Sequence, residues 1–223
     1  MAGYEVRRVD ELDAIPVDGA EIVWRPVRRA LGIRSFGINA YTADAGERVI
    51  EEHTEESVGH EEVYVVLRGR ALFTAGDEEL ELEPATLVYY RDAAVTRGAI
   101  ALEDGTAVLA IGGKPGEVFA PSAWEWWFAA EPHYTRGDYE GALAVVEEGL
   151  AERPDSPGLH YAAATNLARL GCRDEALARL RTAVELGPQP REWAPTDDAF
   201  ASLRDDPEFL AITGQSDAAD GGS

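Results

Sequence analysis

The sequence predicts an α+β protein with two domains, an all-β N-terminal half followed by an α-helical C-terminal half. Short β-prone runs, separated by turn signals, fill residues 21–113. From Ser122 onward, apolar residues recur at every third or fourth position, which is the period of an amphipathic helix. One pattern of turns and prolines also occurs twice within this helical part. A chain of 223 residues is long enough for two small domains of this kind.

Residues 1–20 precede the first β-prone run, and their polar, proline-interrupted sequence predicts an arm or an edge strand. They lack the apolar core of a secretory signal peptide, and no apolar run approaches the length of a membrane span. The single cysteine, Cys172, cannot form an internal disulfide and fits a reducing compartment. We therefore expect a cytoplasmic protein.

The β-rich part follows this arm, and we expect it to span residues 21–116. Turn-forming pairs such as Gly76–Asp77 and Asp104–Gly105 separate its short runs. Many short strands at close, regular spacing predict a sandwich or a barrel. The expected strands are Glu21–Val27, Gly37–Tyr41, Arg48–Glu52, Val63–Leu67, Ala71–Ala75, Glu79–Leu82, Thr86–Tyr90 and Ala107–Ile111.

The helical part contains two equivalent turns, at Gly137 and Gly171, each followed by an alanine–leucine pair and later by a closing proline. This arrangement resembles the tetratricopeptide repeat, a helix–turn–helix unit whose length matches the spacing of the two glycines. Trp126 stands where that family's first-helix tryptophan does, and His160 takes this place in the second repeat. The resemblance implies helical hairpins that bind a protein partner or a second copy of the chain. The expected segments are residues 117–212 for the domain, about 123–156 and 157–190 for the repeats, about 197–210 for a capping helix and 213–223 for a disordered tail.

A histidine-bearing loop precedes one strand of the β-rich part. Gly46 and His53 come first, His60 lies two residues before Glu62, and six residues separate Glu62 from Gly69. On a strand, His60 and Glu62 face the same side. The pattern resembles the first sequence motif of the cupin family. That family has small β-barrels of the double-stranded β-helix, or jelly-roll, type, which often hold a metal ion between histidines.

The second cupin motif corresponds to residues 84–98, where a proline should open a strand and a histidine should supply a further ligand. Pro84 is present, and Ala85 and Thr86 stand where a glycine is common. Arg97 occupies the place of the histidine. The resemblance therefore implies the barrel fold and a homodimer formed through barrel strands, but it implies the metal site only in part.

One set of side chains retains metal-binding chemistry. The set comprises His53, His60 and Glu62, with Glu55 or Glu56 as additional acids. Two histidines and a carboxylate can hold iron, manganese or zinc and leave positions for water or a substrate. Such a site would make the chain a metal-dependent dioxygenase or isomerase.

Arg97 argues against this metal site because a guanidinium does not lose its proton. At ~5 Å from a divalent ion and an effective dielectric of ~20, the repulsion is about 7 kcal/mol. Arg97 is instead expected to pair with Glu62 inside the barrel or to meet an anionic group on a ligand. We therefore expect a ligand-binding site at Arg97, Glu62 and Tyr64, although Tyr64 also fits barrel packing.

The net charge of −22 repels phosphate backbones and anionic lipids, so nucleic acid and membranes are not expected partners. The sequence has no nucleophile elbow, phosphate loop or dinucleotide fingerprint. The leading hypothesis is a non-catalytic protein that binds a small molecule in the barrel and a protein through the repeats. The metal-dependent enzyme is the alternative, and a purely structural dimer is the third.

Overall fold

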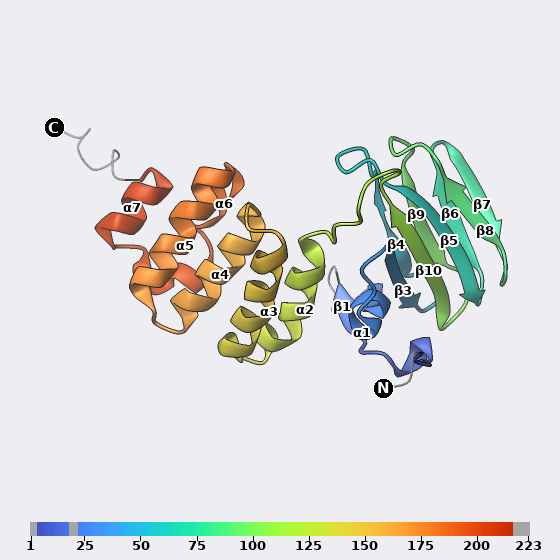
Figure 1. The fold of residues 1–223 in the computed structure, drawn as a ribbon, viewed down its shortest axis with the longest axis horizontal. Coiled ribbons are helices and arrows are strands. Elements are labelled where there is room, and N and C mark those ends of the chain that lie inside the picture. The colour runs from blue at the N-terminus through green and yellow to red at the C-terminus, as the bar shows by residue number, and fades with distance from the viewer. Residues whose placement is uncertain (1–3, 18–21, 216–223) are drawn as a thin grey trace. The chain divides into compact units, whose positions relative to one another are not determined.

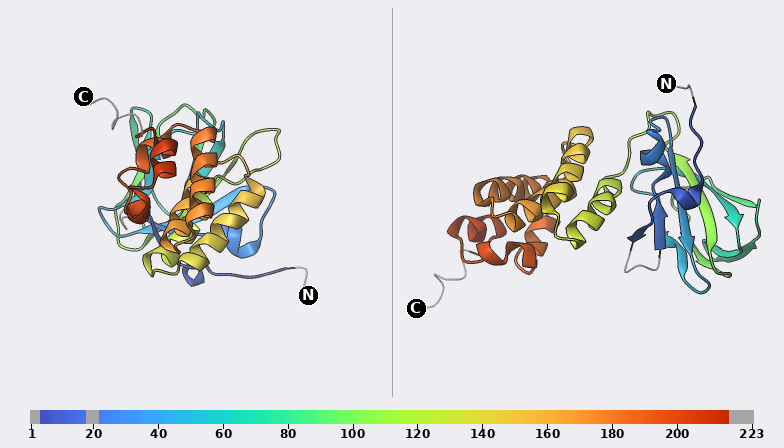
Figure 2. Two further views of the ribbon diagram at one scale, coloured as in Figure 1. Left: turned by 90° about the vertical axis from the view of Figure 1, so that its left-hand side faces the viewer. Right: turned by 90° about the horizontal axis from the view of Figure 1, so that it is seen from below.

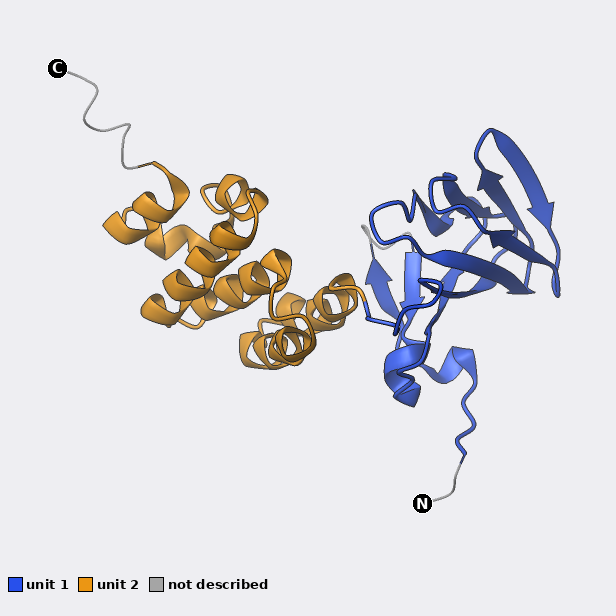
Figure 3. Ribbon diagram, turned by 45° about the horizontal axis from the view of Figure 1, so that its top comes forward, with its two compact units in different colours: residues 1–121 blue, residues 122–223 orange. Residues whose placement is uncertain are grey.

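The computed structural model describes residues 4–17 and 22–215 (Figure 1). The chain divides after Pro121 into two compact units, residues 1–121 and 122–223, each with a hydrophobic core of its own (Figure 3). The predicted order of a β-rich half followed by a helical half is confirmed. Of the predicted tail 213–223, residues 216–223 lie outside the described part of the chain.

The first unit consists almost entirely of strands, and we call it the β unit. It also contains a 3-10 helix η1 and one short helix α1. The elements are η1 (Val9–Glu11), β1 (Ile15–Val17), β2 (Ile22–Arg25), α1 (Val27–Leu31), β3 (Gly37–Ala43), β4 (Arg48–His53), β5 (Glu61–Arg68), β6 (Ala71–Ala75), β7 (Glu78–Leu82), β8 (Leu87–Tyr90), β9 (Arg97–Ala101) and β10 (Thr106–Gly113).

The strands of the β unit form two antiparallel sheets, with orders β1-β2-β3-β10-β5-β8 and β4-β9-β6-β7. Without β1 and β2, these are the two four-stranded sheets of a jelly roll. Alternating side chains from both sheets fill the space between them. Tyr64 and Val66 come from β5, Phe73 from β6 and Val108 from β10, and each is at most 2% exposed.

Three elements of the β unit differ from the sequence prediction. The strand expected at Glu21–Val27 ends at Arg25, and α1 follows it. By contrast, residues 1–20 do contain an edge strand, one of the two predicted alternatives, because β1 pairs with β2 at the edge of its sheet and therefore tolerates Pro16. Strand β9 was not predicted because its sequence, RGAIA, contains glycine and alanine rather than mainly β-branched residues.

The second unit is helical, and we call it the helical unit. Its elements are α2 (Trp124–Thr135), α3 (Tyr139–Glu152), α4 (Pro157–Arg169), α5 (Arg173–Leu186), α6 (Gln189–Trp193), the 3-10 helix η2 (Asp198–Leu203) and α7 (Pro207–Thr213). Helices α2 to α5 form two successive hairpins, visible as side-by-side coils in Figures 1 and 2. No helix in the described residues is long and apolar enough to cross a membrane.

Each hairpin turns at a glycine in the left-handed region, Gly137 and Gly171, both with a φ of 76°. The second helix of each hairpin then begins at the equivalent position, two residues after its glycine. Side-chain capping also fixes the helix starts, because Asp138 accepts from the amide of Gly141 and Ser156 from that of Leu159. The repeat in the sequence is therefore a repeat of the same helix–turn–helix geometry.

The single capping helix expected at about 197–210 is instead two pieces, η2 and α7. Asp206 caps α7, and Pro207 stands at its first position, where a proline starts a helix well but does not continue one. Phe200 from η2 and Phe209 from α7 are fully buried and pack against the core of the second hairpin. The cap therefore covers the apolar end of the repeats, as expected, with a different local structure.

Candidate functional site

The candidate site of the β unit lies where the two sheets face each other at one end of three strands. His53 ends β4, Arg97 begins β9, and the two residues pair directly across those strands. Glu62 comes from β5 in the opposite sheet, and Tyr64 follows it on the same face. The fold therefore brings His53, Glu62, Tyr64 and Arg97 together from both layers.

Arg97 is completely buried, with 0% of its surface exposed. Its Nη1 donates to Glu62 Oε2 over 3.1 Å, and its Nη2 and Nε donate to the backbone carbonyls of Asp92, Ala93 and Val95 at 3.1–3.2 Å. The guanidinium also lies 4.7 Å from the centre of the Tyr90 ring. A buried charge needs such partners, and here the protein supplies all of them.

Glu62 is the acceptor at the centre of the cluster. Its Oε2 accepts from Arg97 and, over 2.7 Å, from the hydroxyl of Tyr64, and it lies 3.8 Å from His53 Nε2. Burial alone would raise the pKa of this carboxyl group. The donors His53 and Tyr64 and the charge of Arg97 outweigh burial and lower the pKa, so Glu62 is ionised.

His53 is held as a cation. Burial disfavours its charged form, but hydrogen bonds to Glu55 and Glu62 and to the carbonyl of Glu51 raise the pKa of His53 to about 10. Its Nδ1 donates to the Glu51 carbonyl over 2.7 Å, and its Nε2 lies 3.4 Å from Glu55 Oε1. Both ring nitrogens are therefore used as donors near pH 7.

The remaining predicted site residues lie at the edge of this cluster. His60 Nδ1 lies 3.4 Å from Glu55 Oε2, so His60 meets Glu62 only through that shared acid. Glu55 is thus a central member, whereas the sequence suggested it only as an alternative to Glu56. Glu56 is exposed and belongs to no close group of ligating atoms in the described residues.

The donor set permits a direct check of whether a divalent metal fits. His53, Glu55 and Glu62 each offer one ligating atom within 4.8 Å of the others. Two features oppose a metal at this place. His53 would first have to lose the proton that both acids stabilise. Arg97 is bonded to Oε2 of Glu62 and would remain charged beside the ion. As arranged, the cluster fits a proton and a guanidinium better than a metal ion.

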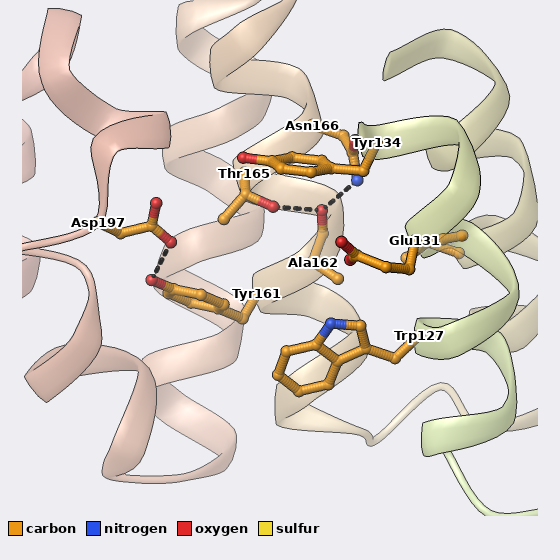
Figure 4. A pocket seen from close by; sticks show the side chains of 10 residues that line it. Trp127, Glu131, Tyr134, Tyr161, Ala162, Thr165, Asn166 and Asp197 are labelled. Carbon is orange, nitrogen blue, oxygen red and sulfur yellow. Dashed lines mark hydrogen bonds between the residues drawn. The ribbon is translucent and has the colours of Figure 1, made fainter. Parts of the chain in front are cut away.

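A second candidate site is a pocket of about 180 Å³ in the helical unit, between α2, α3 and α4 (Figure 4). Trp127, Glu131 and Tyr134 line it from α2, and Tyr161 and Asn166 line it from α4. This pocket is not predicted from the sequence. The available signal was Asn166, a polar residue on the buried, alanine-rich face of its helix.

These observations define the class of protein. The β unit has jelly-roll topology, and its spacing from Glu62 to Gly69 resembles the first cupin motif, whereas the repeated hairpins of the helical unit have the geometry of a tetratricopeptide-type array. Arg97 is buried in the β unit and is paired with Glu62.

Comparisons with known proteins found one family model and several similar structures. Residues 133–195 match the family model described as tetratricopeptide repeat. The fold is similar to KdgF from a Halomonas species, with 21% identity over 46% of this chain and 88% of that chain and a TM-score of 0.40. It is also similar to a sugar phosphate isomerase of the cupin superfamily from Silicibacter pomeroyi, with 14% identity over 48% of this chain and 74% of that chain and a TM-score of 0.42.

A third similar structure is an RmlC-like cupin protein from a Desulfovibrio desulfuricans subspecies, with 22% identity over 48% of this chain and 96% of that chain and a TM-score of 0.38. At this level of similarity, these structures carry no information about activity. No curated protein matches the sequence.

Proposed function

We propose that this protein is a non-catalytic binding protein, in which the β unit binds a small polar molecule and the helical unit binds a protein. The observation that carries the proposal is the buried pair of Arg97 and Glu62. By the resemblance of residues 46–69 and 84–98 to the two cupin motifs, both residues correspond to positions where that family often has metal ligands. Arg97 then acts as a positioning residue that fixes the carboxylate of Glu62.

The accessible part of the cluster suggests the chemistry of the small molecule. The side chains of His53, Glu55 and Glu62 are 31%, 18% and 15% exposed, so a ligand can reach them. Two carboxylates face one imidazolium and one guanidinium, so the charges of the cluster balance. A neutral molecule with several hydroxyl groups suits such a surface, because its hydroxyls donate to the carboxylate oxygens of Glu55 and Glu62 without adding a charge to the cluster.

A thermal-shift titration tests the ligand-binding proposal. The probes are xylitol and glucose as neutral polyols, acetate as an anion and methylammonium as a cation. A bound ligand stabilises the folded protein by an amount that rises with its concentration, about 2.7 kcal/mol at 100 times its Kd. We expect a saturable shift with a polyol, a smaller shift in His53→Gln, and no change in the exposed control Tyr89→Phe.

A polyol that shifts the melting temperature equally in all three proteins would act as an osmolyte and contradict the proposal, because osmolytes act without a site. A shift confined to acetate or methylammonium would contradict the neutral character of the ligand. The Tyr89 side chain is a suitable control because it is 48% exposed on β8 and faces away from the cluster.

The second candidate function is a metal-dependent enzyme of the dioxygenase or isomerase type. The observation that favours it is the proximity of ligating atoms from His53, Glu55 and Glu62, within 4.8 Å of one another. Iron, manganese or zinc would accept these donors and polarise a bound substrate. In such an enzyme, His60 would not be a direct ligand and would act on the metal site through its contact with Glu55. We rank this function second because Arg97 keeps its charge beside the ligand oxygens.

Self-association is part of the proposal for the whole chain. The sheet that contains β5 ends at β8, where Leu87 is 63% and Tyr89 48% exposed. An edge strand with apolar side chains is a surface that pairs readily with another copy. We therefore propose a homodimer through the β unit, and light scattering of Leu87→Lys against the parent protein tests it. A parent protein with the mass of one chain would contradict the dimer.

A further inference from the structure

The pocket of the helical unit combines three kinds of group on one small surface. Figure 4 shows aromatic rings, carboxylates and an amide that surround the same space from α2, α4 and the start of η2. We propose that this pocket binds the arginine or lysine side chain of a partner protein. The inference rests on the proposed protein-binding role of the helical unit and specifies the chemistry of its partner.

The aromatic rings that line the pocket can contact both the methylene groups and the charged end of an arginine or lysine side chain. Trp127 is 43% exposed although it belongs to a packed helix, so its ring is available to a partner. Tyr134 and Tyr161 form other parts of the wall. Aromatic faces attract cations, and long basic side chains place their methylene stems on apolar surfaces. A volume of about 180 Å³ admits one side chain rather than a folded segment.

The carboxylates provide charge complementarity. Glu131 is exposed on α2, one turn from both Trp127 and Tyr134, and it accepts a hydrogen bond from the hydroxyl of Thr135 over 3.0 Å. In the part of the chain that the structure describes, Glu131 forms no ion pair with a basic side chain. Asp197 accepts from Tyr161 over 2.8 Å and adds negative charge on the far side of the pocket.

Arg169 limits the role of Asp197. It hydrogen-bonds to Tyr134 and places positive charge near Asp197, which it partly offsets. Glu131 is therefore the carboxylate that we assign to the charge of the incoming side chain. Asp197 mainly holds Tyr161 and caps η2, since it also accepts from the amide of Ala199 over 2.8 Å.

Asn166 supplies an independent indication that a donor is missing. Its side chain is 3% exposed and lines the pocket. Its Nδ2 donates to the carbonyl of Ala162 over 2.8 Å, which fixes the amide, because the opposite orientation would set two oxygens against each other. Its Oδ1 then has no hydrogen-bond partner in the described structure. This oxygen is enclosed by its neighbours, so a guanidinium or ammonium N–H supplies the missing donor once the side chains that line the pocket move apart.

A peptide titration of the full chain tests the inference. The probe is the blocked pentapeptide Gly-Ser-Arg-Ser-Gly, and its matched versions carry citrulline or glutamate in place of arginine. Citrulline keeps the shape of arginine and removes its charge. The readout is the NMR signal of the Trp127 indole N–H, assigned through Trp127→Phe. We expect the arginine peptide to bind at least about ten-fold more tightly than the citrulline peptide.

Variants separate this pocket from the general attraction of an acidic protein for basic peptides. Glu131→Gln should lower the affinity for the arginine peptide about ten-fold. Glu185→Gln removes the same charge from an exposed site on α5 and should leave its affinity within about two-fold. Equal losses in the two variants would mean non-specific attraction and would overturn the inference.

The outcomes also distinguish this inference from the broader proposal. If the citrulline or glutamate peptide binds as tightly and perturbs the Trp127 signal, the pocket binds peptides and the preference for a cation is wrong. If no probe perturbs that signal, the pocket is not a peptide site, and both the inference and the protein-binding role proposed for this face are wrong.

Discussion

At the scale of single residues, Arg97 determines what the β unit can do. The sequence resemblance predicts a histidine at this position in a complete metal site, and the structure surrounds Arg97 with one carboxylate, three carbonyls and an aromatic ring. Arg97 therefore links the two sheets, since Glu62 belongs to the opposite one. A residue that resembles a lost ligand in the sequence is a structural cross-link in the fold.

Replacing Arg97 with glutamine should destabilise the β unit. The change leaves Glu62 partly buried and without its cation, which costs about 3 kcal/mol for a buried pair that loses one partner. Chemical denaturation of the purified variants measures this loss. Arg91→Gln is the matched control, because Arg91 is exposed and lies over the ring of Tyr89. Equal stability of Arg97→Gln and the parent protein would contradict the cross-link.

His53 should give the β unit a pH-dependent stability. Its pKa is about 10 in the folded protein against 6.5 for an ordinary histidine, so folding favours the protonated form. The stabilisation is complete below pH 6.5 and is lost as the pH rises through 10. NMR titration of the ring proton should show the raised pKa, and Glu55→Gln should lower it by about one unit. A His53 pKa near 6.5 in the parent protein would contradict the ion-pair cluster.

At the scale of elements, the turn before β8 carries strain. Ala85 has a φ of 65° and is the non-glycine residue with a positive φ among the described residues. In the motif that residues 84–98 resemble, a glycine is common near this position. An alanine in the left-handed region costs about 1 kcal/mol that a glycine avoids.

Ala85→Gly should therefore stabilise the β unit by about 0.5 kcal/mol, because the gain exceeds the extra entropy that glycine gives the unfolded chain. Equilibrium denaturation measures the difference. Ala94→Gly serves as the comparison, since Ala94 has an ordinary φ and should lose stability on the same change. A loss in both variants would show that the turn at Ala85 is not strained.

The elements also show what could be predicted from the sequence. Strands with β-branched and aromatic residues, such as β5 and β8, were predicted because their local sequence favours extended structure. Strand β9 is held by pairing with β4 and β6, so its local sequence carried little signal. Arg97 is the first residue of β9, so the hydrogen-bond partners of its side chain were not fully predictable from the sequence. The ion pair with Glu62 was anticipated, whereas the three carbonyls depend on the turn at residues 92–95.

The same limit explains the pocket of the helical unit. The hairpins were predictable because turn glycines and prolines recur at a fixed period. The pocket combines side chains from α2, α4 and the residue before η2, so its lining extends along the chain from Trp127 to Asp197. No local pattern connects residues that are so far apart in the sequence, so only the folded structure identifies the site.

At the scale of the whole molecule, the two units have separate hydrophobic cores. Residues 1–121 and 122–223 should therefore each fold when produced alone, because each buries its own apolar side chains. Circular dichroism should show a β-rich spectrum for the first fragment and a helical spectrum for the second. Two cooperative thermal transitions are expected, and an unfolded second fragment would contradict the independence of the helical unit.

The metal content of the purified, untagged protein most directly tests the proposed role of the β unit. After reconstitution with iron, manganese and zinc and removal of excess ions, plasma mass spectrometry gives the metal bound per chain. We expect far less than one ion per chain in the parent protein, because His53 is protonated and Arg97 stays charged beside Glu62. A nearly stoichiometric ion that is lost in His53→Ala would contradict this account and favour the metal-dependent enzyme.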